Sequence, residues 1–223
     1  MANKIPQSWI HSQDAFERAF HLGDVISDEV FVNNLYLTIN LLEFLGASYS
    51  FWEIDPSYAP VYCQNYLTVL GSLYEGIIQG AFREKERRCR DACSVCDRGG
   101  DCPFYWAKDE HAGKVMGSEL RFIDMIDRAS CLGMLEGLSE DDINGIRKIR
   151  NNIHLGRMNR RFQDTEILST ETINSYQAIL KKLFAGIYKW LKLNGDVCLY
   201  DESESSLSKR GIDFDSLNGK FGV

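Results

Sequence analysis

Residues 143–155 place cationic and proton-transferring side chains at helical spacing. On a helix, which turns by about 100° per residue, Arg147, Arg150 and His154 fall within about 60° of one another, and Asn151 lies slightly further around. Guanidinium groups bind the non-bridging oxygens of phosphate, and an imidazole exchanges a proton near neutral pH. This ridge therefore indicates phosphate-ester chemistry.

The charge of the chain is segregated around the ridge. The protein has 25 basic and 32 acidic side chains, a formal net charge of −7. Residues 147–163 hold six basic side chains and no acid, which leaves 19 basic against 32 acidic elsewhere. This balance disfavours general binding to nucleic acid or to an anionic membrane and confines any polyanion site to this segment. Exposed arginines on an amphipathic helix, with a histidine capping helix carbonyls, would give the same pattern, so both interpretations stay open.

Residues 147–155, with the sequence RKIRNNIHL, resemble the signature of the HEPN superfamily, small all-helical domains in which four to six residues separate an arginine from a histidine. Residues 67–75 resemble the glutamate-containing second helix common in these domains. Arg147 has the spacing of the motif arginine, whereas Arg150 is followed directly by the polar residue that often accompanies it. Which arginine matches the motif stays open.

The resemblance implies metal-independent cleavage of RNA by a homodimer in which both motifs face one cleft. In that scheme His154 handles the proton of the attacking 2′-hydroxyl or of the leaving oxygen. Arg147 and Arg150 would stabilise charge on the phosphorane, and Asn151 would position the phosphate. Because HEPN relatives act in toxin–antitoxin and antiviral systems, the resemblance also implies an antitoxin or defence-system partner. The alternative is a non-catalytic helical interaction or sensor module.

Four cysteines are crowded into fourteen positions: Cys89, Cys93, Cys96 and Cys102. Glycines and aspartates between the third and the fourth allow the chain to turn back, and neighbouring arginines favour thiolates. This set predicts a structural, tetrahedral Zn²⁺ site that holds a small insertion together. The same spacing suits an iron–sulfur cluster, which is the alternative, and His111 could replace one cysteine.

Helices must position these residues, because apolar side chains recur at three or four positions and no segment alternates like a strand. The apolar stripes cover residues 31–45, with Gly46 as a stop, then 62–81, 120–132 and 176–190, the last closed by Asn194. Ser139 and Asp142 have capping-box spacing, which predicts that a helix starts at Ser139. The sequence predicts an all-α protein, an antiparallel bundle of four or five helices with a small metal-binding insertion.

We expect one HEPN-like domain over residues 1–200, with a Cys-rich insertion at 87–113 and an acidic, poorly ordered tail at 201–223. The first residues have no apolar core of signal-peptide length. The stretch 35–52 contains Asn40 and Glu43 and is typical of a core helix more than of a membrane span. We therefore expect a cytoplasmic protein without a membrane partner.

Overall fold

The chain is all-helical over the part that the computed structural model describes, as the apolar periodicity predicts. That part comprises residues 11–51, 55–92, 121–135, 137–153 and 168–194. Two short 3-10 helices, η2 (Leu22–Asp24) and η3 (Pro56–Tyr58), accompany the α-helices. The α-helices are α1 (Gln13–Phe20), α2 (Glu29–Phe51), α3 (Ala59–Ala92), α4 (Phe122–Cys131), α5 (Glu140–Ile153) and α6 (Thr170–Asn194).

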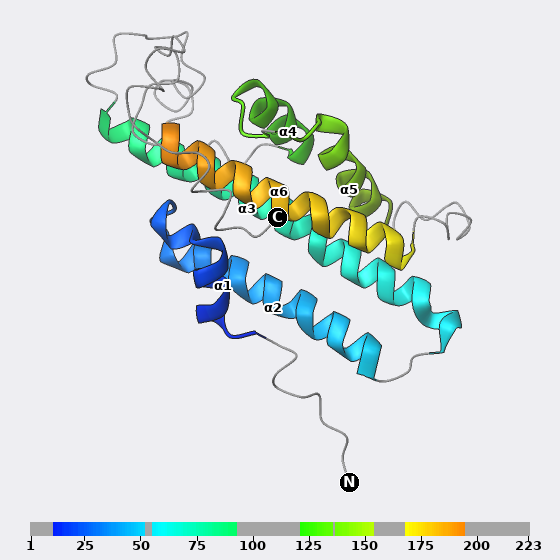
Figure 1. Ribbon diagram of the computed structural model, residues 1–223. Coiled ribbons are helices and arrows are strands. Elements are labelled where there is room, and N and C mark those ends of the chain that lie inside the picture. Colours follow the sequence, from blue (N-terminus) through cyan, green and yellow to red (C-terminus); the bar gives the residue numbers. More distant parts are fainter. Residues whose placement is uncertain (1–10, 52–54, 93–120, 136, 154–167, 195–223) are drawn as a thin grey trace.

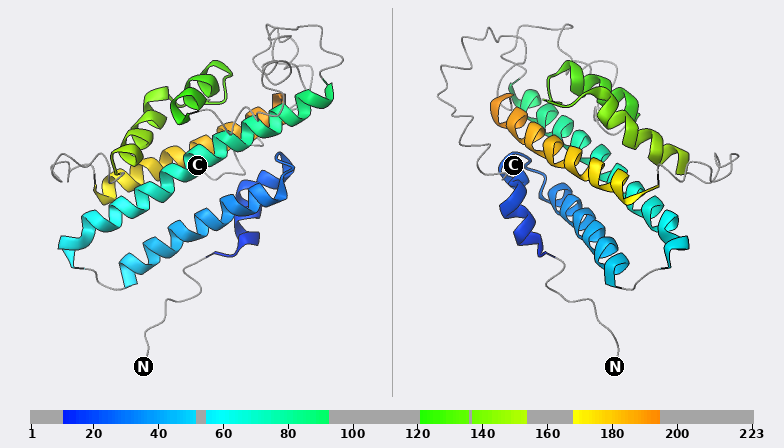
Figure 2. Two further views of the ribbon diagram at one scale, coloured as in Figure 1. Left: turned by 180° about the vertical axis from the view of Figure 1, so that it is seen from behind. Right: turned by 45° about the vertical axis from the view of Figure 1, so that its right-hand side comes forward.

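The long helix α3 is the centre of the arrangement and contacts α2, α4, α5 and α6 (Figure 1). In all views α2 lies on one side of α3 and α6, while α4 and α5 lie on the other side (Figure 2). Large side chains of α3 are therefore buried all round its middle, including Leu70, Tyr74, Ile77 and Phe82. Any residue of α5 that reaches α3 is thus separated from α2 by the core.

Two glycines of α3 allow α2 to approach closely. A Cβ at Gly80 would overlap the ring of Phe31, and a Cβ at Gly76 would lie 3.1 Å from Cδ2 of Leu35. Phe31 and Leu35 are one turn apart on α2, as the two glycines are on α3. This contact of small with large residues fixes how α2 packs on α3.

Gly46 does not stop α2, so this expected helix end is wrong. The helix continues to Phe51. A helical glycine costs about 1 kcal/mol relative to alanine, but packing beyond it outweighs this cost. Ala47 is buried, and the ring of Tyr49 stacks on that of Tyr62 with centroids 4.0 Å apart.

One further boundary and one additional helix differ from the expectation. The backbone of α3 runs on to Ala92, so the first part of the expected 87–113 insertion is helical. Helix α1 was not predicted because its apolar stripe is short; its start is capped by the Ser12 hydroxyl, which accepts from the backbone N–H of Ala15. The rest of the insertion and the 201–223 tail lie outside the described residues.

Helix α2 is long and apolar enough to cross a membrane by length and composition alone, a test that core helices of soluble proteins also pass. One face of α2 packs against the core, and the expectation that the 35–52 stretch is a core helix more than a membrane span stays a prediction. The opposite face is exposed. The residues on the packed face are Val32, Leu35, Tyr36, Ile39, Leu42 and Ala47.

Candidate functional site

The helix that carries the arginine ridge starts where the capping box predicts. The backbone N–H and the hydroxyl of Ser139 both donate to Oδ2 of Asp142, each at 2.8 Å, and Ser139 Oγ accepts from the backbone N–H of Asp142 at 3.2 Å. These bonds hold the pKa of Asp142 below its usual value. Acids in the first turn of α5 and Arg150 in the last complement the helix dipole. The start of α5 is thus fixed by local sequence.

The apolar face of α5 sets the direction of the ridge. Ile143 and Ile146 are completely buried, and Ile149 packs against the same core at the edge. A Cβ at Gly145 would overlap the hydroxyl of Tyr176 on α6, so glycine permits this close contact. Side chains that lie about 60° to 100° around the helix axis from this apolar face stand at the border between core and solvent.

Arg150 reaches α3. Its Nη1 lies 2.5 Å from Oε2 of Glu75, and the two side chains are 24% and 27% exposed. Its stem lies on Gly71, where a Cβ would be 3.1 Å from Cβ and 3.2 Å from Cδ of Arg150. A glycine one turn before the glutamate therefore gives the arginine its path, and the ion pair joins α5 to α3.

Arg147 precedes Arg150 by one turn on the same ridge. Its Nε donates to Oδ1 of Asn144 at 2.9 Å, and the residue is half-buried. Asn151, which follows Arg150, is also half-buried. The structure thus brings three of the four predicted ridge residues to the border between α5 and solvent, where guanidinium and amide donors can meet a phosphate.

The remaining predicted site residues lie outside the described side chains. His154 directly follows the last described residue of α5, Ile153. The backbone of Cys89 belongs to α3, but its side chain is not described, and Cys93, Cys96 and Cys102 lie in the 93–120 gap. In the described ranges, no three His, Cys, Asp or Glu side chains come together as metal ligands. The zinc site and its iron–sulfur alternative stay predictions.

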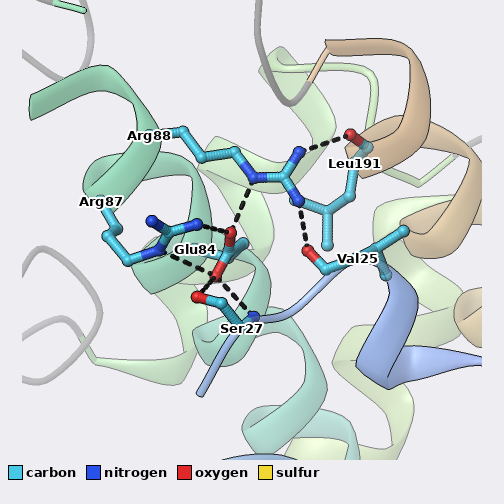
Figure 3. A network of polar contacts seen from close by, with 6 residues as sticks. All are labelled: Val25, Ser27, Glu84, Arg87, Arg88 and Leu191. Carbon is cyan, nitrogen blue, oxygen red and sulfur yellow. Dashed lines mark hydrogen bonds and ion pairs between the residues drawn. The ribbon is translucent and has the colours of Figure 1, made fainter. Parts of the chain in front are cut away.

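Sequence reasoning missed a charged network near the end of α3 (Figure 3). Glu84 is 2% exposed. Its Oε2 accepts from the backbone N–H and the hydroxyl of Ser27 at 3.0 and 2.9 Å. Its Oε1 accepts from Nη2 of Arg87 at 2.6 Å and from Nε of Arg88 at 2.7 Å. Burial alone would raise the pKa of Glu84, but these donors outweigh it and lower the pKa to about 2.

The Arg88 guanidinium also ties together three parts of the fold. Nη2 donates to the carbonyl of Val25 at 2.6 Å, and Nη1 donates to the carbonyl of Leu191 on α6 at 3.3 Å. The signal for this network was the spacing of Glu84 from Arg87 and Arg88, three and four residues on. From the sequence, the arginines beside Cys89 are considered only as groups that favour thiolates, whereas the guanidinium groups of Arg87 and Arg88 bind Glu84.

No protein-family model, curated protein or solved structure matches the chain. The HEPN resemblance therefore depends on residues 147–155 and 67–75. The contact between Arg150 and Glu75 joins these two segments.

Proposed function

We propose that this protein is a metal-independent endoribonuclease of the HEPN type that binds the RNA phosphate at Arg147, Arg150 and Asn151 and transfers protons through His154. The observation that carries the proposal is the ion pair between Arg150 and Glu75. It supports the proposal because it connects the two segments that carry the resemblance, although they are far apart in the sequence.

The ion pair leaves a defined role for Arg150. A guanidinium has five N–H donors in a planar fork, and the pair with Glu75 engages Nη1. In the proposed complex Nε and Nη2 donate hydrogen bonds to the phosphate, while Glu75 holds the plane of the guanidinium. A positioned donor is worth more in a transition state than a mobile one, because it needs no reorganisation. Glu75 is then a positioning residue.

In the proposed reaction the RNA 2′-hydroxyl attacks the adjacent phosphorus. The bond from O2′ to phosphorus forms, the bond from phosphorus to O5′ breaks, and the proton passes from the 2′-hydroxyl to the leaving oxygen. His154 handles this proton at one of the two positions. Arg147 and Arg150 stabilise the added charge on the phosphorane. The Zn²⁺ predicted at Cys89, Cys93, Cys96 and Cys102 has a structural role in this proposal.

Two partner proposals depend on the resemblance alone. One is a homodimer whose motifs face a common cleft, and the other is an antitoxin or defence-system protein. A cytoplasmic location is also proposed, because Asn40 and Glu43 interrupt the apolar stretch 35–52.

RNA cleavage is tested by incubating the purified full chain with labelled single-stranded RNA in buffer without divalent cations. We expect cleavage that falls by about 10² to 10⁴ in His154→Ala. Arg147→Ala and Arg150→Ala should also lose activity. Lys148→Ala is the matched control, because Lys148 is an exposed cation on α5 about 100° from Arg147. RNA with a 2′-deoxy group at the cleaved nucleotide should resist, since the nucleophile is missing.

A non-catalytic interaction module is the second candidate. One observation supports it: Arg150 and Arg147 both bond to side chains of this chain, Glu75 and Asn144, as purely structural contacts would. No cleavage at any ratio of protein to RNA, together with a loss of stability in Arg150→Ala, would support the module against the nuclease.

A further inference from the structure

The large exposed apolar side chains of the described residues lie on α2, on η3 and at the start of α3, away from the arginine ridge. None of the large exposed ones described lies on α4, α5 or α6. They are Val30, Leu37, Leu41, Phe44, Tyr58 and Val61. The four on α2 are 70%, 58%, 44% and 46% exposed in chain order.

With the exposed residue Asn34, the four α2 residues form a regular row. We call Val30, Asn34, Leu37, Leu41 and Phe44 the α2 seam. Successive members are four, three, four and three residues apart, which is the spacing of the contact positions of a coiled coil. At 1.5 Å per residue, the seam is about 21 Å long. Its partner is thus expected to be another α-helix that runs along α2.

The residues beside the seam do not select a partner of opposite charge. Coiled coils choose partners through charges at flanking positions. In α2 the charged residues are Glu29 at the first position and Glu43, whose carboxylate accepts from the backbone N–H of His11 and pairs with its Nδ1. Neither acid occupies one of the flanking positions of the seam, so the seam can face its own copy without repulsion there, as an isologous interface requires.

Asn34 has the same property. Its amide carries both donors and acceptors, so two copies can bond to each other. A single asparagine at a contact position also fixes register and oligomeric state in coiled coils, at a cost in stability. The seam is therefore suited to a defined pair of helices.

We propose that a second copy of this chain docks on the α2 seam, so that the protein is a dimer through α2. This goes beyond the proposed function and differs from the motif-facing homodimer that the resemblance implies. Because α2 and α5 lie on opposite sides of α3 and α6, the helices that carry the two arginine ridges lie on the sides of α3 and α6 away from the dimer contact (Figures 1 and 2). A particle of two chains joined in this way cannot also bring both motifs to one cleft, so the α2 dimer is an alternative to the motif-facing homodimer, and each ridge would meet RNA separately.

The test measures the mass of the full chain in solution by analytical ultracentrifugation. We expect the wild type at twice its chain mass of 25.5 kDa. The double variant Leu37→Glu with Leu41→Glu should weaken the dimer by about tenfold or more, because it places like charges in the seam. The matched control is Asn174→Glu with Ser175→Glu, which adds the same charge at exposed positions of α6 and should leave the dimer intact.

Charge reversal gives a second measurement. A copy with Leu37→Lys and Leu41→Lys and a copy with Leu37→Glu and Leu41→Glu should each be monomeric and should pair when mixed. Circular dichroism of each variant should match the wild type, because the substituted side chains are exposed. Asn34→Leu should tighten the dimer.

Three results would overturn the proposal. These are a wild type that stays monomeric at its highest soluble concentration, a dimer that survives the two glutamates but separates in Arg147→Ala, and a wild type that binds phosphatidylcholine vesicles through the seam in place of a second copy. None of the seam residues belongs to the arginine ridge, so the seam variants change no residue that the RNA cleavage assay tests.

Discussion

Nη1 of Arg150 on α5 and Oε2 of Glu75 on α3 meet at 2.5 Å, with the stem of the arginine lying on Gly71. Each side chain keeps about a quarter of its surface exposed. The pair is therefore partly shielded from water, which strengthens the attraction between the two charges. It joins α5 to α3 and, in the proposed nuclease, it also orients the guanidinium of Arg150.

We expect a measurable coupling energy between Glu75 and Arg150. A double-mutant cycle of Glu75→Gln and Arg150→Ala, followed by urea unfolding, should give about 1 kcal/mol, because the pair is half-buried but still reached by solvent. Arg150→Ala alone should destabilise by more than Glu75→Gln, since it also removes the packing on Gly71. Lys148→Ala should change the free energy of unfolding by less than about 0.5 kcal/mol. A coupling energy of zero would contradict the clamp.

The glycines of α2 and α3 should respond oppositely to alanine. Gly80→Ala should destabilise the protein by about 1 to 3 kcal/mol, because the new Cβ overlaps the ring of Phe31 and overpacks the contact between the helices. Gly46→Ala should stabilise by about 0.5 to 1 kcal/mol, because the nearest atom to its Cβ, the hydroxyl of Tyr62, is 3.9 Å away and alanine favours helix. Thermal unfolding of both variants measures the two signs. Equal effects would show that these contacts do not set the packing.

The sequence predicted the parts of the fold that depend on neighbours in the chain. The capping box of Ser139 and Asp142 is local, so its spacing sufficed to place the start of α5. The expected end of α2 at Gly46 was wrong because it was judged on local preference, whereas the stacking of Tyr49 on Tyr62 is a tertiary contact. Tertiary packing routinely overrides propensity.

The candidate site divides in the same way. Helical periodicity placed Arg147, Arg150 and Asn151 on one edge of α5. The partner of Arg150 followed from no spacing, because Glu75 belongs to another helix and the path between them depends on the missing side chain of Gly71. The sequence likewise did not predict that Leu37, Leu41 and Phe44 of α2 are exposed, since an apolar stripe that faces solvent and one that faces the core have the same periodicity.

Glu84 should make the stability of the protein depend on acid. Its pKa in the folded state is about 2, below the ordinary value of 4.5. A carboxylate whose pKa is lowered by folding stabilises the protein at any pH above its ordinary pKa. This stabilisation is lost as the pH falls towards the folded-state pKa, so the loss should occur between about pH 5 and pH 2. Its full size is about 3 kcal/mol. The difference in free energy of unfolding between wild type and Glu84→Gln should shrink over this range.

Urea unfolding at pH 7, 4 and 3 measures that difference. Gly46→Ala is the control, because it changes stability without removing a titratable group. Its difference from the wild type should stay nearly constant over the same range. A Glu84→Gln difference that does not depend on pH would mean that the pKa of Glu84 is the same in the folded as in the unfolded protein.

The cysteine cluster should bind metal independently of Cys63, which lies in the core. We expect elemental analysis of the purified chain to find about one zinc ion, without visible absorption, because Zn²⁺ is colourless and an iron–sulfur cluster is not. Cys96→Ser should lose the metal. Cys63→Ser should keep it, since Cys63 is buried on α3 and is 1% exposed, although the substitution places a hydroxyl in the core and lowers the melting temperature. Metal that persists in Cys96→Ser but leaves in Cys63→Ser would place the ion elsewhere, and a brown protein would favour the iron–sulfur alternative.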